Sequence, residues 1–295
     1  MGLFRIRKFS YTLSSLFVLA SVISLWTYGL RLGIDFTGGS FLEINYSLER
    51  PEIALVSAKL EALNLGQIIL QPLGERGFSV RSRELSAIEV SQVLAAFSQL
   101  GDIQDSNFYA LSSSLGREVA IRSLWSIALV LLAIVLYIAF AFRKVSKPVS
   151  SWFYGLFAVA ALFHDILIPL GVFSLLGKFK GVEVDTLFVT ALLTVLGFSV
   201  HDTIVVFDRV RENLKNQIKN EDFEETVDRS LSQTLVRSIN TSLTVLIVLV
   251  SLYFFGAEST RYFSLALIIG IIAGTYSSIF IAAPLLVTWN NWRNR

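Results

Sequence analysis

The sequence contains no cysteine and has few charged residues. Of its 295 residues, 16% are charged and 54% are hydrophobic, whereas soluble chains average roughly 25% charged residues. The lack of cysteine excludes a disulfide framework, thiol catalysis and zinc–thiolate sites. The shortage of charge excludes a disordered chain or a nucleic-acid-binding tail, so we expect no nucleic-acid partner. This composition indicates a polytopic protein embedded in a lipid bilayer.

Motifs for nucleotide, metal or covalent chemistry are also missing. The chain has no Gly-x-x-x-x-Gly-Lys-Ser/Thr motif, which would indicate a phosphate-binding loop. Its two histidines, His164 and His201, lie in separate apolar stretches and do not have the spacing of a metal site. We therefore expect no cofactor, no metal and no enzymatic activity. Energy for any transport would come from a partner or an ion gradient, and one elementary charge crossing 100 mV supplies about 2.3 kcal/mol.

Six stretches with few charges are long enough to cross a bilayer, which takes about 20 apolar residues. They lie between residues 8 and 31, 122 and 143, 147 and 178, 185 and 208, 237 and 258, and 261 and 293. The first resembles a signal peptide in following basic residues, but it is long for one and lacks a clean small-x-small cleavage site. We expect it to be retained, which makes six transmembrane helices.

Lys and Arg residues predict the orientation, because short cytoplasmic loops carry an excess of them. They gather in the N-terminal tail, in the loop after the second span, in residues 208–237 and at the C-terminus. The two short loops on the other side contain only Lys178, Lys180 and Arg261. Both termini are therefore predicted to be cytoplasmic. The expected domains are residues 1–36 (tail and first helix), 37–120 (an outside domain) and 121–295 (helices two to six, with the cytoplasmic loop 208–237).

The outside domain has the sequence pattern of a small α+β fold. Strands are predicted at residues 41–46, 68–71, 78–81 and 103–109. Amphipathic helices are predicted to begin at Pro51 and at Ser86, where Ser86 and Glu89 form a capping-box pattern. The order β-α-β-β-α-β is that of a ferredoxin-like fold. Whether this domain touches a partner or a translocating chain, or is a plain spacer, stays open.

Two groups of glycines are candidate structural motifs. Asp35, Gly38 and Gly39 lie where the first span leaves the membrane, and paired glycines permit positive φ and close backbone approach. Without other evidence they could simply form a turn between a helix and a strand. Gly270 and Gly274 in the sixth span have the small-xxx-small spacing that allows close helix contact.

Only two of the 23 acidic residues fall within predicted spans, and each directly follows a histidine. They are Asp165 in the third span and Asp202 in the fourth. A charged group at the centre of a membrane helix costs about 2.5–3.5 kcal/mol on insertion scales. Such residues mark an ion path, a proton relay or a buried pair. For His164 and Asp165, a hydrogen bond that fixes helix packing explains the residues equally well.

Asp202 is predicted to lie at the same depth as a polar stripe at the start of the fifth span. The stripe consists of Arg237, Asn240 and Thr241, followed by Thr244 at helical spacing. An aspartate and an arginine in adjacent spans can pair and relieve both burial penalties. Asp202 could take and release a proton if the pair separates, or the pair could be static. His201 could shuttle protons or bond to a nearby backbone group.

Several segments together resemble the SecF family of bacterial protein-export membrane subunits. They are residues 33–39 (Gly-Ile-Asp-Phe-Thr-Gly-Gly), 163–168, 197–213, 231–242 and 277–284. The resemblance covers the whole chain in order, and segment 197–213 is close to the family's fourth-helix signature. It implies six spans of the RND superfamily in the bacterial inner membrane and a ferredoxin-like periplasmic domain.

The resemblance also implies function and partners. Family members work with SecD, with the SecYEG channel and the SecA motor, and often with YajC, to move preproteins. They use the proton motive force, or sodium in some members. Asp202 and Arg237 fall on positions that the family uses for ion coupling. Asparagine is common before that aspartate, and His201 replaces it here, which adds a titratable group.

Two other classes of function remain as alternatives. Small-molecule exporters of the same superfamily usually have twice as many spans and much larger outside domains. A passive scaffold subunit would stabilise a partner and conduct nothing. A membrane-embedded hydrolase is a more distant alternative, because no nucleophile–base pair stands out.

Overall fold

The computed structural model describes residues 7–66, 68–143, 149–216 and 221–294. These residues form two compact units, one spanning Leu32–Leu124 and the other containing the chain before and after it. Parts of the basic segments that predict the orientation, among them Arg5, Lys144, Lys147 and Lys219, lie outside the described residues.

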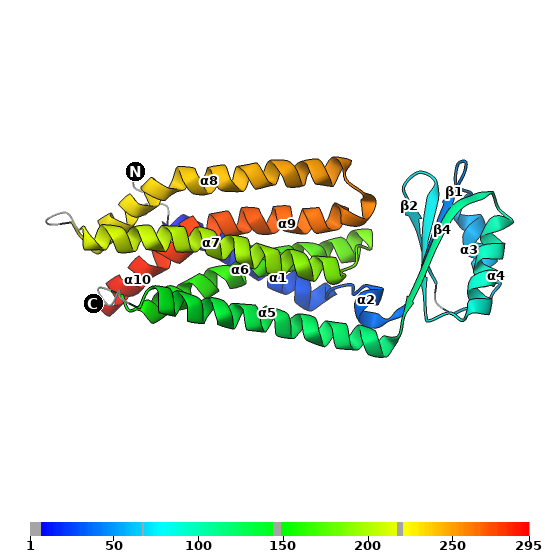
Figure 1. The fold of residues 1–295 in the computed structure, drawn as a ribbon, viewed down its shortest axis with the longest axis horizontal. Coiled ribbons are helices and arrows are strands. Elements are labelled where there is room, and N and C mark those ends of the chain that lie inside the picture. The colour runs from blue at the N-terminus through cyan, green and yellow to red at the C-terminus, as the bar shows by residue number, and fades with distance from the viewer. Residues whose placement is uncertain (1–6, 67, 144–148, 217–220, 295) are drawn as a thin grey trace. The chain divides into compact units, whose positions relative to one another are not determined.

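The unit Leu32–Leu124 contains one four-stranded antiparallel sheet with two helices on one face (Figure 1). The strands are β1 (Gly39–Tyr46), β2 (Ile69–Leu73), β3 (Gly77–Ser82) and β4 (Ile103–Leu111), in the spatial order β2-β3-β1-β4. The helices are α3 (Ile53–Glu61) and α4 (Ala87–Ser98). This order and topology confirm the predicted ferredoxin-like fold.

The core of this unit follows from the period of two along β1. Leu42, Ile44 and Tyr46 all point to the helix-covered face and are buried. They pack against Phe78 of β3 and Phe97 of α4, both of which are fully buried. The Tyr46 hydroxyl donates a hydrogen bond to the Phe97 carbonyl at 3.2 Å, so the sheet and α4 are joined by polar as well as apolar contact.

The two glycines of the first motif lie where the chain enters the sheet. A single turn, α2 (Ile34–Thr37), has Asp35 in its first turn and ends at Gly38, whose φ is +73°. A Cβ on Gly38 would lie 2.5 Å from the Cα of Ser113, at the start of helix α5 (Ser113–Ala141). Gly39 has φ +126°. Side chains at these positions would therefore clash or strain the backbone.

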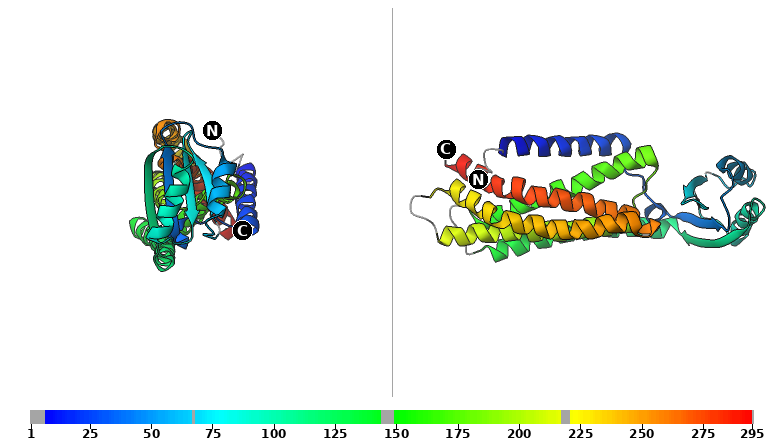
Figure 2. Two further views of the ribbon diagram at one scale, coloured as in Figure 1. Left: turned by 90° about the vertical axis from the view of Figure 1, so that its right-hand side faces the viewer. Right: turned by 90° about the horizontal axis from the view of Figure 1, so that it is seen from above.

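The other unit is a bundle of long apolar helices (Figures 1 and 2). They are α1 (Arg7–Tyr28), α5, α6 (Ser151–Lys180), α7 (Thr186–Lys215), α8 (Phe223–Phe255) and α9 (Glu258–Ser277), the last continued by η2 (Ser278–Ala282) and α10 (Ala283–Arg293). With α9, η2 and α10 counted as one span, the described residues contain six helices long and apolar enough to cross a membrane. The predicted six spans are confirmed.

The helices of the bundle differ in how much of their surface other helices cover. In α6 and in the span from α9 to α10, 61% of the most apolar stretch is buried, against 6% in α5 and 17% in α8. α6 and the last span therefore form the centre, and α1 packs along α6 (Figure 2). The apolar side chains of the outer helices face outward, as a lipid environment requires.

Residues 208–237 differ from the expected loop. Helix α7 continues to Lys215 and α8 begins at Phe223, so most of this segment extends the two membrane helices. Ion pairs within α7, from Arg211 to Asp208 and from Arg209 to Glu212, support its last turns. An Asp222–Glu225 capping box starts α8. Most of the expected cytoplasmic loop thus consists of extensions of these two helices.

The start of α4 yields a prediction about pH. Hydrogen bonds from Arg83 and from the Ser86 amide and hydroxyl lower the pKa of Glu89 to about 2. Because this value lies below the usual 4.5, ionised Glu89 stabilises the folded helix start above pH 4.5, and this support is lost as the pH falls through about 2. Hydrogen-exchange protection of the first turn of α4, corrected for intrinsic rates, should fall over that interval.

The control variant is Glu89→Gln, which keeps the side chain's size and removes its charge. We expect lower protection at neutral pH in this variant and no further loss between pH 4.5 and 2. Identical pH profiles in the wild type and the variant would contradict the assignment.

Candidate functional site

Eight buried polar side chains form a layer across the middle of the bundle. We call them the polar layer; they are Asp165, Ser199, Asp202, Thr203, Ser238, Ser242, Ser277 and Ser278. Along each contributing helix, buried apolar residues of one cluster come before these positions and buried apolar residues of a second cluster come after them. Polar groups are costly in such surroundings unless they are hydrogen-bonded. The layer is therefore where the bundle's specific polar interactions are concentrated.

Asp165 of α6 is the most connected side chain of the polar layer. It is fully buried, and its Oδ2 accepts hydrogen bonds from the hydroxyls of Ser199 at 2.5 Å and Ser277 at 2.7 Å. Ser199 belongs to α7 and Ser277 is the last residue of α9. One carboxylate oxygen therefore joins three membrane helices.

His164 is the neighbour of this carboxylate. Its Nδ1 lies 2.9 Å from Asp165 Oδ1, and its Nε2 is buried with no hydrogen-bonding partner among the described residues. The ring stacks on Tyr276 of α9, with centroids 6.1 Å apart. Tyr276 in turn donates to the Ser10 carbonyl and accepts from Ser14, both on α1. A fourth helix is thus connected to the same place.

Asp202 of α7 is 6% exposed and has a sparser environment. Its Oδ1 accepts a hydrogen bond from Ser238 of α8 at 2.8 Å, and its Oδ2 is buried without a partner in the described part of the chain. The next residue, Thr203, shares a hydrogen bond with Ser278 at 2.9 Å. Asp202 is the carboxylate of the layer whose hydrogen-bonding capacity is least satisfied.

The structure does not bring Asp202 and Arg237 into a direct ion pair within the described residues. Arg237, Asn240 and Thr241 lie on the exposed face of α8, while the next residue after Arg237, Ser238, faces Asp202. His201 is also exposed, because it precedes Asp202 on a helix and points about 100° away. The predicted ion-coupling residues therefore form two groups. One group is buried (His164, Asp165 and Asp202), and the other faces outward (His201, Arg237, Asn240 and Thr241).

Glycines and a wide helical turn bring α7 and the last span together. A Cβ on Gly270 would lie 2.2 Å from Val195 Cγ2, and one on Gly274 would lie 2.8 Å from Ser199 Cβ. Directly after Ser277 the helix makes a π-helical turn, η2, which is a rare feature often found at functional sites. The close approach places Ser199 and Ser277 within reach of the same carboxylate oxygen.

Sequence reasoning missed most of the hydroxyl partners. The sequence analysis does not identify Ser238, Ser242 or Ser277 as site residues, although their positions within apolar runs are a usable signal. Ser242 bonds to Thr275 of α9 at 2.5 Å, so these hydroxyls tie α8 to the last span as well. Which serine meets which carboxylate depends on helix packing, and that is not visible in the sequence.

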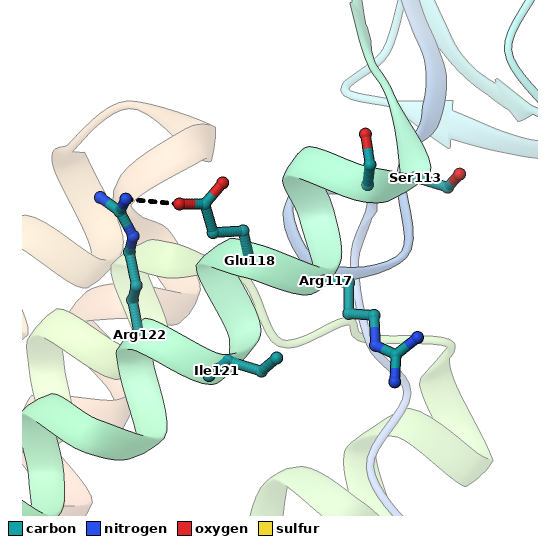
Figure 3. A pocket seen from close by; sticks show the side chains of 6 residues that line it. Ser113, Arg117, Glu118, Ile121 and Arg122 are labelled. Atoms are coloured by element: carbon teal, nitrogen blue, oxygen red, sulfur yellow. Dashed lines mark hydrogen bonds and ion pairs between the residues drawn. The ribbon is translucent and has the colours of Figure 1, made fainter.

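The described residues contain no group of three or more His, Asp or Glu that could hold a metal ion. A surface hollow at the start of α5 is lined by Ser113, Ser114, Arg117, Glu118, Ile121 and Arg122. Figure 3 shows Glu118 turned toward Arg122, with which it pairs, while Arg117 points elsewhere. All six side chains are exposed, so this hollow has the character of a solvated surface rather than a built site.

Comparison with known proteins gives consistent matches. A family model described as protein export membrane protein SecD/SecF, C-terminal, matches residues 90–292, and one described as SecD/SecF GG motif matches residues 23–47. The chain is 47% identical over 297 residues to protein translocase subunit SecF of Thermobaculum terrenum, covering 95% of this chain and 91% of that protein. It is 38% identical to the SecF of Anaerolinea thermophila, with 98% and 94% covered.

Among solved structures, the chain is similar to the crystal structure of SecDF from Thermus thermophilus. The TM-score is 0.82 at 29% sequence identity, and the match covers 99% of this chain but 39% of that chain. The chain thus spans nearly the whole length of its SecF relatives and less than half of the SecDF protein.

The close approach of α7 and α9 yields a second prediction. Gly274→Ala should destabilise the bundle by about 1–3 kcal/mol, because overpacking of this size forces neighbours to move. The matched control is Gly197→Ala on α7, where a Cβ would meet nothing within 4 Å. That change should be neutral or stabilising by up to about 1 kcal/mol, since alanine favours helix. Unfolding in detergent micelles measures both, and equal stabilities of the two variants would refute the close contact.

Proposed function

This chain belongs to the SecD/SecF family of protein-export membrane proteins, and on that premise we propose that it is an accessory subunit of the Sec protein translocase. It resides as a multi-pass protein in the bacterial inner membrane, with both termini in the cytoplasm. With a SecD-type partner it uses the proton motive force, or sodium, to promote movement of preproteins through SecYEG. It acts after or beside SecA, with YajC as a further partner.

The exposed polar face of α8 supports a SecD-type partner. Arg237, Asn240 and Thr241 face outward from a helix whose apolar stretch must lie in the bilayer. An arginine facing lipid within a membrane helix is unfavourable by about 2.5–3.5 kcal/mol on insertion scales. The similar SecDF chain is far longer than this one, which matches 39% of it. A SecD-type partner, which would correspond to the remainder of such a SecDF chain, would cover this face of α8.

The hydrogen-bonding environment of Asp202 is the observation that supports the ion-coupling role. It is a buried carboxylate with one hydroxyl partner and one oxygen left without a partner among the described residues. Such a group can gain or lose a proton with little loss of existing hydrogen bonds. Arg237, one residue from Ser238 on α8, supplies positive charge near it. A rotation of α8 would bring Arg237 toward Asp202 and remove Ser238, which couples the state of the carboxylate to helix position.

The third prediction tests this role. Asp202→Asn should abolish the gradient-stimulated part of export while leaving assembly with SecD intact, because the amide keeps the Ser238 hydrogen bond but cannot carry a proton. Export would be measured in inverted vesicles that contain this chain and its SecD partner, with and without a proton gradient.

The matched control is Asp208→Asn, which removes a carboxylate from the same helix at an exposed position paired with Arg211. It should leave the response to the gradient intact. An Asp202→Asn variant that assembles and still responds fully to the gradient would make the chain a scaffold subunit instead.

A further inference from the structure

The contacts of Asp165 bear on which ring nitrogen of the neighbouring His164 carries a hydrogen. Asp165 Oδ2 accepts hydrogen bonds from both Ser199 and Ser277. An ionised carboxylate can only accept hydrogen bonds. Where Asp165 is ionised, the 2.9 Å contact between its Oδ1 and His164 Nδ1 places a hydrogen on Nδ1. In a neutral imidazole, the other nitrogen, Nε2, then has a free lone pair.

Nε2 is the unused atom of this arrangement. His164 is 6% exposed, and Nε2 has no hydrogen-bonding partner among the described residues. We propose that His164 is a proton-accepting residue within the membrane bundle, with Asp165 as the positioning residue that holds the ring in the Nδ1–H form. This inference deepens the proposed export function and rests on it, because it adds a second protonation site to the polar layer.

The proton balance of the step is simple. With a neutral ring, the pair of Asp165 and His164 carries one negative charge. A proton that arrives at Nε2 forms an N–H bond with the ring lone pair and gives an imidazolium, while Nδ1–H stays bonded to Asp165. The pair then has no net charge. Neutralising a buried charge in a bilayer-spanning bundle offsets a desolvation cost, so the loaded state is accessible.

Protonation of His164 changes the hydrogen bonds through which Asp165 joins the helices. A positive ring draws the charge of the carboxylate toward Oδ1, and the hydrogen bonds that Oδ2 receives from Ser199 and Ser277 weaken, since charge-assisted bonds depend on that charge. These two hydroxyls belong to α7 and to the end of α9. The π-helical turn η2 follows Ser277 directly, so the weakened bond lies beside a segment of irregular helix.

The groups facing the pair are few. From α9 the titratable group is Tyr276, which stacks on the ring and bonds to α1 through Ser10 and Ser14. From α7 only the Ser199 hydroxyl reaches Asp165, while the carboxylate of Asp202, nearly one turn further, turns to Ser238. From α1 the contacts are the serines named above, and its charged Arg7 pairs with Glu224 instead. The proton on His164 is therefore governed mainly by Asp165.

The test is nuclear magnetic resonance of the full chain labelled with [15N]histidine in micelles. The chain has only two histidines, and the variants His164→Gln and His201→Gln assign their signals. At high pH, His164 should show a protonated Nδ1 and a deprotonated Nε2. On acidification, Nε2 should gain a proton while Nδ1 stays protonated. A neutral His164 with its hydrogen on Nε2, or a ring whose Nε2 never gains a proton on acidification while the bundle stays folded, would overturn the proposal.

Three variants separate positioning from a purely structural role. Asp165→Asn offers an amide that can donate as well as accept, so it should no longer hold the neutral ring in the Nδ1–H form alone. Ser277→Ala retains the carboxylate and should preserve the Nδ1–H form. Ser174→Ala is the matched control, because Ser174 is a buried α6 serine that bonds to Ser24 of α1; it should leave both His164 signals unchanged. If Asp165→Asn does not fold, the wild-type spectrum alone decides.

The spectrum tests the proposal for His164 and the export measurement tests the proposal for Asp202, so either proposal can fail without the other. If Asp202→Asn still responds to the gradient while His164 shows the Nδ1–H form and loads a proton, the export role fails and the proton-accepting pair stands. If Asp202→Asn loses the response while neutral His164 carries its hydrogen on Nε2, the coupling role of Asp202 stands and the pair is a packing contact.

Discussion

The burial of one carboxylate, Asp165, is the constraint on which the arrangement of the membrane helices depends. A carboxylate in an apolar bundle is tolerated only if its oxygens receive hydrogen bonds. Those bonds come from Ser199 and Ser277 on two other helices, and from His164 beside it. α6, α7 and the last span must therefore keep one relative position for this charge to be accommodated. Association by packing alone would not set the position so narrowly, because lipid tails are as apolar as the helix surfaces.

Close approach of the helices allows these hydrogen bonds to Asp165 to form. Gly270 and Gly274 let the last span approach α7 until Ser199 and Ser277 reach the same oxygen. The π-helical turn η2 follows directly after this contact. Asp202, by contrast, has one hydroxyl partner from α8, a helix that is covered far less than α6. The polar layer thus combines a firmly held carboxylate with one held by a peripheral helix, an arrangement suited to movement at α8.

Sequence patterns predicted the fold better than the site. Charge-free stretches give the six spans, and period-two alternation with the Ser86–Glu89 capping box gives the order of the small domain. Both are local signals that burial enforces. The pairing of Asp202 with Arg237 was inferred from similar depth, yet depth does not determine direction around a helix, and Ser238 rather than Arg237 faces the carboxylate. The convergence of Ser199 and Ser277 on Asp165 depends on helix approach, which no single segment encodes.

The central claim, that one oxygen of Asp165 joins three helices, is tested most directly by a double-mutant cycle. The free energy of unfolding in micelles would be measured for Ser199→Ala, Ser277→Ala and the double variant. Either single change leaves one hydroxyl on Oδ2, whereas the double change leaves a buried carboxyl oxygen without a donor. The double variant should therefore lose more stability than the sum of the single changes, by at least about 0.5 kcal/mol. Additive losses would show that the two serines act separately, and would contradict the account.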